Sequence, residues 1–92
     1  MLSILLSTYN VVVQPLVHDL LHQARQLNIP FEILIEDDAS TDRRVCVENH
    51  ALLSEPEVAY FQNHVNKGRS KVRNHLAAAA NYPYLLFIDG DA

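Results

Sequence analysis

Residues 82–91 have the sequence YPYLLFIDGD, which joins a short apolar run to an acidic turn. The run at 84–88 shows no polar alternation, as is typical of a strand that is covered on both faces of a parallel sheet. Asp89 and Asp91 flank a glycine at the carboxyl end of this expected strand, which is the end where open α/β sheets bind ligands. If the extended geometry continues through Gly90, both carboxylates point to one side, and a hard cation such as Mg²⁺ or Mn²⁺ would offset their repulsion.

Asp-Gly-Asp alone is also an ordinary polar turn. However, a second acidic pair, Asp37 and Asp38, follows another apolar run at residues 31–35. Two buried strands that both end in paired carboxylates favour one shared site. Within the second pair, Asp37 is predicted to be structural, with its carboxylate bonded to N–H groups of its own loop.

Four apolar runs alternate with three segments of helical periodicity. The expected strands are 2–6, 31–35, 58–61 and 84–88. The expected helices are 15–28, 40–53 with Ser40 or Thr41 as the N-cap, and a segment that opens at 67–70 and ends before 81–83. This β-α-β-α-β-α-β order with short loops predicts an α/β fold with a Rossmann-like parallel sheet and right-handed crossovers.

The chain has 92 residues, fewer than a doubly wound α/β fold usually needs to close its sheet. We therefore expect residues 1–92 to form the first part of a larger domain, with an unsatisfied sheet edge and an incompletely covered face. Such an edge can pair with another copy of itself, which makes a homodimer plausible.

The composition is 49% hydrophobic and 20% charged, as in ordinary soluble domains. The net charge of −4 argues against a nucleic-acid partner, and the single cysteine, Cys46, excludes an internal disulfide. No apolar run approaches the length of a membrane span, and no signal peptide is evident. We therefore expect a cytoplasmic protein, in which any membrane anchor would belong to segments outside these residues. His18 and His22 have metal-ligand spacing but no third ligand, which disfavours zinc.

The loops after the first, second and fourth expected strands should meet at one end of the sheet. They contain residues 8–10, the acidic pair at 37–38 and the motif at 89–91. Gly68 and Gly90 are the only glycines, so neither a dinucleotide fingerprint nor a P-loop can be present. A nucleotide bound here would need a metal to hold its phosphates.

Four blocks in order resemble the successive signatures of family 2 glycosyltransferases, which are inverting enzymes of the GT-A fold. They are SILLSTYN at 3–10, ILIEDDASTD at 33–42, NKG at 66–68 followed by Arg73-Asn74, and FIDGD at 87–91. The resemblance covers nearly the whole chain and implies that it is the N-terminal, nucleotide-sugar-binding portion of a GT-A domain.

The resemblance implies a role for the first two loops in binding the nucleotide base. Thr8, Tyr9 and Asn10 would pack on the base, and Asp38 would accept a hydrogen bond from a uracil-type ring. From the residues alone, Tyr9 could equally pack under the first helix and Asn10 could equally cap it.

The resemblance places the phosphates and a metal near the other motifs. Arg69 and Lys71 would border the base and phosphates, Asp89 would lie near the ribose, and Asp91 would hold the metal that bridges the diphosphate. Ala92 departs from the family pattern, in which many members carry another acidic residue at this position.

The implied reaction is metal-dependent transfer of a sugar from a nucleotide-diphosphate sugar, UDP- or GDP-linked, to an acceptor hydroxyl with inversion. The cofactor would be Mn²⁺ or Mg²⁺, and the acceptor would be a saccharide, a lipid-linked sugar or a protein, as in cell-wall or polysaccharide biosynthesis. The family's catalytic base lies further along the chain, so we assign no catalytic residue here and expect no turnover from these residues alone.

Two rival functions come from other classes. A phospho-acceptor receiver domain also combines an acidic pocket like ILIEDD with an acceptor strand like LLFID, although here the acidic pair follows the second strand. The other rival is a non-catalytic nucleotide-binding module.

Overall fold

A computed structural model describes residues 1–90, and Asp91 and Ala92 lie outside the described residues. The elements in chain order are β1 (Leu2–Thr8), α1 (Gln14–Gln26), β2 (Phe31–Asp37), α2 (Arg43–His50), the 3₁₀ helix η1 (Ala51–Ser54), β3 (Val58–Gln62), α3 (Arg69–Ala79) and β4 (Tyr84–Asp89). The predicted alternation of strands and helices is confirmed. None of the helices in residues 1–90 has the length and apolar character needed to cross a membrane.

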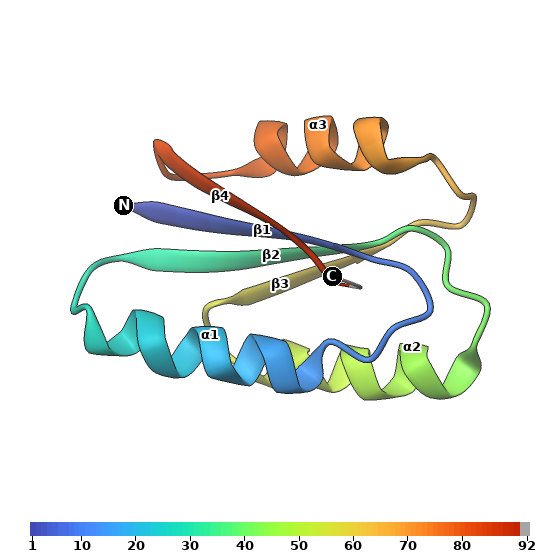
Figure 1. Ribbon diagram of the computed structural model, residues 1–92, viewed down its shortest axis with the longest axis horizontal. Coiled ribbons are helices and arrows are strands. Elements are labelled where there is room, and N and C mark those ends of the chain that lie inside the picture. Colours follow the sequence, from blue (N-terminus) through green and yellow to red (C-terminus); the bar gives the residue numbers. More distant parts are fainter. Residues whose placement is uncertain (91–92) are drawn as a thin grey trace.

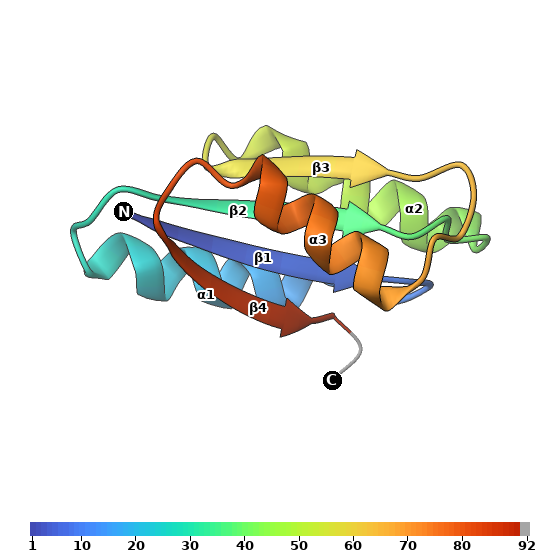
Figure 2. The same ribbon diagram turned by 90° about the horizontal axis from the view of Figure 1, so that it is seen from above.

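The four strands form one parallel sheet in the order β3-β2-β1-β4. Helices α1 and α2 cover one face and α3 covers the other (Figures 1 and 2). The chain therefore has the Rossmann-like α/β architecture that its sequence predicts. In this order the carboxyl ends of β1, β2 and β4 are neighbours: Thr8 pairs with Asp37, and Ser7 pairs with Asp89.

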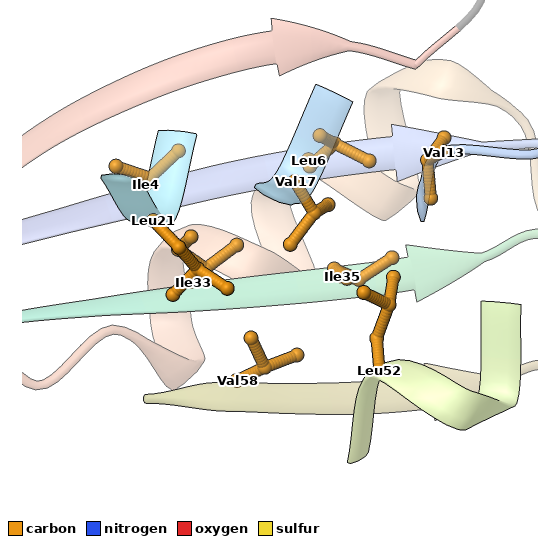
Figure 3. Packing of buried hydrophobic residues seen from close by; sticks show 9 residues of the cluster. All are labelled: Ile4, Leu6, Val13, Val17, Leu21, Ile33, Ile35, Leu52 and Val58. Atoms are coloured by element: carbon orange, nitrogen blue, oxygen red, sulfur yellow. The ribbon is translucent and has the colours of Figure 1, made fainter. Parts of the chain in front are cut away.

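Alternation along the strands divides the core into two layers. On the side of α1 and α2, nine buried side chains pack together: Ile4, Leu6, Val13, Val17, Leu21, Ile33, Ile35, Leu52 and Val58 (Figure 3). On the α3 side, a smaller cluster consists of Leu5, Leu34, Val72 and Leu76. Strands β1 and β2 contribute to both layers because successive side chains point to opposite faces.

The prediction that residues 84–88 are covered on both faces is wrong. Strand β4 lies at the edge of the sheet, and its side chains from Tyr84 to Phe87 are all exposed. A continuous apolar run indicates a strand with apolar neighbours but does not reveal its place in the sheet, and here β4 pairs only with β1 among the described strands. The expected free edge and incompletely covered face are thus present in this part of the chain.

The predicted N-cap of the second helix is also wrong, because α2 is capped by Asp42. Its Oδ1 atom accepts hydrogen bonds from the N–H groups of Arg44, at 3.0 Å, and Val45, at 3.5 Å. The hydroxyl of Ser40 is occupied instead by the main-chain N–H of Asn10, at 2.7 Å. Pro15 lies in the first turn of α1, where the N–H that proline lacks would have no partner within the helix.

Candidate functional site

A hollow of about 240 Å³ lies at the carboxyl ends of β1, β2 and β4, beside the start of α3. We call it the cleft. Its lining residues are Ser7, Thr8, Tyr9, Asp38, Asn66, Gly68, Arg69, Val72 and Asp89. Of the site residues predicted from sequence, the structure brings together Thr8, Tyr9, Asp38, Arg69 and Asp89. Asn10 and Lys71 do not line the cleft.

The loop after β1 gives the cleft one aromatic side chain. Tyr9 is 46% exposed, so it does not pack under α1. Thr8 is buried, and its hydroxyl donates to the carbonyl oxygen of Val11 at 3.2 Å. Its main-chain oxygen accepts from the N–H of Asp38 at 3.0 Å, which ties the first loop to the second.

Asn10 joins two loops instead of capping α1. Its Oδ1 atom accepts hydrogen bonds from the N–H groups of Thr41, at 2.8 Å, and Asp42, at 3.0 Å. The residue has φ of 54°, a left-handed conformation that Asn tolerates better than most residues. Its role in this structure is to hold the β1 loop against the start of α2.

Asp37 is structural, as the sequence predicts. Its side chain is completely buried, and its Oδ1 atom accepts from the N–H of Ser40 at 2.7 Å. Its Oδ2 atom accepts from the hydroxyl of Tyr60 at 2.8 Å. Burial, together with this contact to Asp37, raises the pKa of the Tyr60 hydroxyl above its usual range.

Asp38 lies at the wall of the cleft and is 8% exposed. Its Oδ1 atom accepts from the N–H of Lys67 at 2.8 Å and from Nδ2 of Asn63 at 3.1 Å, and its Oδ2 atom accepts from the N–H of Gly68 at 2.9 Å. Burial opposes ionisation of this carboxyl, but the hydrogen bonds from Lys67, Gly68 and Asn63 outweigh it and hold the pKa below its ordinary value. Asp38 is therefore an ionised carboxylate that anchors the start of α3.

Asp89 and Arg69 face each other across the cleft. Oδ2 of Asp89 lies 3.7 Å from a terminal nitrogen of Arg69, and its Oδ1 atom accepts from the hydroxyl of Ser7 at 2.9 Å. The side chains of Arg69 and Asp89 are 68% and 36% exposed, and a pair this open to solvent contributes little to stability. Both groups can therefore exchange their partner for a ligand at low cost.

Gly90 follows Asp89 at a point with no room for a side chain. A Cβ atom there would lie 2.8 Å from the carbonyl oxygen of Ser7 and 2.8 Å from a methyl group of Val13. The N–H of Gly90 donates to that same carbonyl at 2.7 Å. This close approach explains the glycine between the two aspartates, which turn propensity alone does not.

A divalent cation at the cleft has only part of its ligand set in residues 1–90. Asp89 could supply a hard carboxylate ligand, and the expected second ligand, Asp91, lies outside the described residues. Within the described residues, no group of three His, Cys, Asp or Glu side chains could hold a metal ion. This donor set fits Mg²⁺ or Mn²⁺, which commonly use one or two carboxylates and take their other ligands from phosphates and water.

Sequence reasoning missed several residues that build the cleft. Ser7 and Asn66 line it, and Asn63 and the buried Glu36 support Asp38 from behind. The signal for Glu36 was its position directly before the acidic pair, within an apolar strand where a charge needs a partner. Asn66 stood in the NKG block at 66–68 without a role of its own, and Asn63 carried no signal, because Asn is common in loops.

Residues 3–92 match the family described as Glycosyl transferase family 2. The chain belongs to this family. An uncharacterized glycosyltransferase of Haemophilus influenzae is 33% identical over 92 residues, which are 99% of this chain and 29% of that protein. The acidic motifs are thus those of a glycosyltransferase family and not of a receiver domain.

Solved structures show that this family 2 chain has the fold of the N-terminal portion of GT-A glycosyltransferases. TarS 1–349 of S. aureus, in complex with UDP-GlcNAc, has a TM-score of 0.71 and 26% identity, and the match covers 98% of this chain and 26% of that one. A mannosyltransferase of Pyrobaculum calidifontis, in complex with GDP-Man and Mn²⁺, has a TM-score of 0.72 at 21% identity and shares the fold, with 99% of this chain and 27% of that one covered. This chain thus spans less than a third of these relatives' length.

Proposed function

We propose that this family 2 chain is the donor-binding part of an enzyme that transfers a sugar from a nucleotide-diphosphate sugar to an acceptor hydroxyl with inversion. The observation that carries the proposal is the convergence of Tyr9, Asp38, Arg69 and Asp89 on one cleft at the carboxyl ends of the strands. The similarity to TarS, whose structure holds UDP-GlcNAc, supports a nucleotide sugar as the ligand.

The base would lie between the first two loops. The exposed ring of Tyr9 offers a stacking surface, and Asp38 offers a carboxylate that is already ionised and oriented. A carboxylate has about four lone-pair positions, and Asp38 uses three of them within the protein. The position left on Oδ2 suits one N–H of a uracil or guanine ring.

The diphosphate would lie between the start of α3 and β4. Arg69 brings a cation with several donors, and the first N–H groups of a helix favour an anion. Asp89, with Asp91 as the expected second carboxylate, would hold Mn²⁺ or Mg²⁺. When bound, the cation would supply Lewis-acid stabilisation of the leaving nucleoside diphosphate.

The acceptor is proposed to be a saccharide, a lipid-linked sugar or a protein. Its binding site and the catalytic base are expected in regions of the relatives that this chain does not span. A homodimer formed through the free edge of β4 is also proposed, since β4 pairs with β1 alone among the described strands.

The test is calorimetric titration of the chain with UDP and with GDP in the presence and absence of Mn²⁺. We expect one nucleotide to bind in a Mn²⁺-dependent manner, and Asp38→Asn and Asp89→Asn each to weaken binding by about tenfold or more, equivalent to roughly 1.4 kcal/mol. Asp89→Asn should also reduce the effect of Mn²⁺. The matched control is Asp19→Asn, which removes an exposed carboxylate on α1 outside the cleft.

Absence of binding by both nucleotides would overturn the donor-site assignment. So would an equal loss of affinity in Asp19→Asn. Nucleotide binding that does not respond to Mn²⁺ would instead favour the rival function, a nucleotide-binding module without transfer activity.

A further inference from the structure

A fully buried carboxylate lies behind the cleft and has no place in the function described so far. Glu36, the residue before Asp37 in β2, is 0% exposed. Its Oε1 atom lies 2.6 Å from Nδ1 of His75 on α3, and its Oε2 atom accepts from Nδ2 of Asn63 at 2.8 Å. Burial of a carboxylate is costly unless it is paired and hydrogen-bonded, and here both oxygens have partners.

Asn63 connects this buried pair to the cleft. A side-chain amide nitrogen carries two hydrogens, and Nδ2 of Asn63 lies within bonding distance of two carboxylates, 2.8 Å from Glu36 and 3.1 Å from Asp38. The main chain of Asn63 is also held, because its N–H donates to the carbonyl oxygen of Asp37 at 2.8 Å. One amide thus joins the carboxylates at positions 36 and 38.

We propose that Asn63 is a positioning residue of the nucleotide site, which acts by holding the Asp38 carboxylate against the main chain of Lys67 and Gly68. We call Glu36, Asn63 and Asp38 the carboxylate–amide bridge. The proposal rests on the proposed function, because it assigns a role within that same site. Asn63 itself does not line the cleft.

The chemistry of the bridge explains why an amide is needed at position 63. Two carboxylates that approach the same point repel each other, and the two N–H groups of one amide satisfy both without adding charge. Without them, Asp38 would lose the donor that fixes its rotation, and its hydrogen bonds from the N–H groups of Lys67 and Gly68 would open more often. The start of α3, where Gly68 and Arg69 line the cleft, would then be less well ordered.

The first experiment does not depend on any nucleotide. Amide hydrogen exchange followed by NMR reports on the N–H groups of Lys67 and Gly68, which donate to Asp38. In Asn63→Ala and Asn63→Asp we expect both amides to exchange about tenfold faster, equivalent to roughly 1.4 kcal/mol of local opening. Glu32→Gln is the matched control, since Glu32 is also a hydrogen-bonded glutamate of β2 but lies at the opposite end of the strand and should leave these two amides unchanged.

The second experiment uses a pH profile that a purely structural role would not produce. Affinity for the nucleotide that the parent chain binds, UDP or GDP, is measured with Mn²⁺ from about pH 7.5 down to about pH 5, and the parent chain is the reference for pH effects on the nucleotide itself. Asn63→Asp places a third carboxyl between Glu36 and Asp38, with His75 beyond Glu36 and Lys67 beyond Asp38. We expect about tenfold weaker binding at neutral pH that recovers as the pH falls, because a shared proton restores a donor.

Asn63→Ala, which cannot be protonated there, should bind weakly at every pH and carries the test if Asn63→Asp fails to fold. Equal pH profiles of the two variants, or full nucleotide affinity in both, would overturn the proposal. If the parent chain binds neither UDP nor GDP, the donor-site assignment fails, and the exchange experiment still decides: unchanged exchange at Lys67 and Gly68 would show that the bridge positions nothing.

Discussion

Strands β2 and β4 have similar sequences but end in different surroundings. Each contains consecutive apolar residues, at 33–35 in β2 and at 84–88 in β4, and each leads into a motif with two aspartates. At the end of β2, Asp37 and Asp38 are buried, and every carboxylate oxygen accepts at least one hydrogen bond within the protein. At the end of β4, Asp89 is partly exposed and has one short hydrogen bond and one long ion pair.

The position in the sheet accounts for this difference. Strand β2 has β1 on one side and β3 on the other, so loops from both neighbours reach its carboxyl end. Strand β4 pairs only with β1 among the described strands. Carboxylates of the inner strand therefore build the frame of the site, with one acceptor position left on Asp38, and the carboxylate of the edge strand stays largely available for a ligand.

The largest expected effect contrasts Asp37 with Asp89. Asp37→Ala leaves the half-buried Tyr60 hydroxyl and the Ser40 N–H without their acceptor, and hydrogen bonds to a charged group contribute about 1.5–3 kcal/mol each. We expect a loss of about 4 kcal/mol in the free energy of unfolding, measured by urea denaturation. Asp89→Ala should cost less, about 2 kcal/mol or under, since it removes one part-buried hydrogen bond from Ser7 and an exposed ion pair that contributes little. Similar losses in the two variants would contradict the division into frame and ligand site.

A second contrast uses two leucines from the same kind of apolar run. Leu34 on β2 is 4% exposed and Leu86 on β4 is 45% exposed. Leu34→Ala should lower the free energy of unfolding by about 3 kcal/mol, because it opens a cavity under α3, and Leu86→Ala by less than about 1 kcal/mol. If Leu86→Ala proves as costly as Leu34→Ala, Leu86 is buried in solution. Sedimentation velocity would then show whether a second copy of the chain covers β4.

The smallest expected effect is the pH dependence of the stability that Asp38 contributes. The pKa of Asp38 is below its ordinary value in the folded chain, so its contribution to stability is present above the ordinary pKa near 4 and is lost as the pH falls through the lower, folded pKa. The difference in unfolding free energy between the parent chain and Asp38→Asn should therefore be greatest at neutral pH and should shrink below about pH 4. Urea titrations at several pH values measure it. A difference that stays constant or grows in acid would mean that Asp38 is not held in its ionised form.

Local patterns were sufficient to locate the strands and to predict which loops share the site. Apolar runs and helical spacing depend on short-range chemistry, and the β-α-β order leaves few ways to arrange parallel strands. The convergence of Thr8, Asp38 and Asp89 follows from that order, and the structure confirms it.

Which of several similar side chains takes a given role depended on competition for hydrogen-bond partners and positions in the folded chain. Ser40, Thr41 and Asp42 are all good helix caps, and Asp42 became the cap of α2 while the Ser40 hydroxyl bonded Asn10 from another loop. Lys71 and Arg69 were equally plausible phosphate contacts, but only Arg69 lies on the side of α3 that faces the cleft. Neither choice is encoded in residues close by in the sequence.

The amino-acid order specified a parallel α/β sheet, its four strands and the acidic motifs of a glycosyltransferase family, because hydrophobic periodicity and turn chemistry act over a few residues. Three-dimensional packing settled that β4 lies at the edge, that every carboxylate oxygen of Asp37 and Asp38 accepts a hydrogen bond within the protein, and that Asn63 links Glu36 to Asp38. Those outcomes join residues up to 82 positions apart, as between Ser7 and Asp89. Such contacts arise only when the sheet has assembled and its loops compete for the same hydrogen-bond partners.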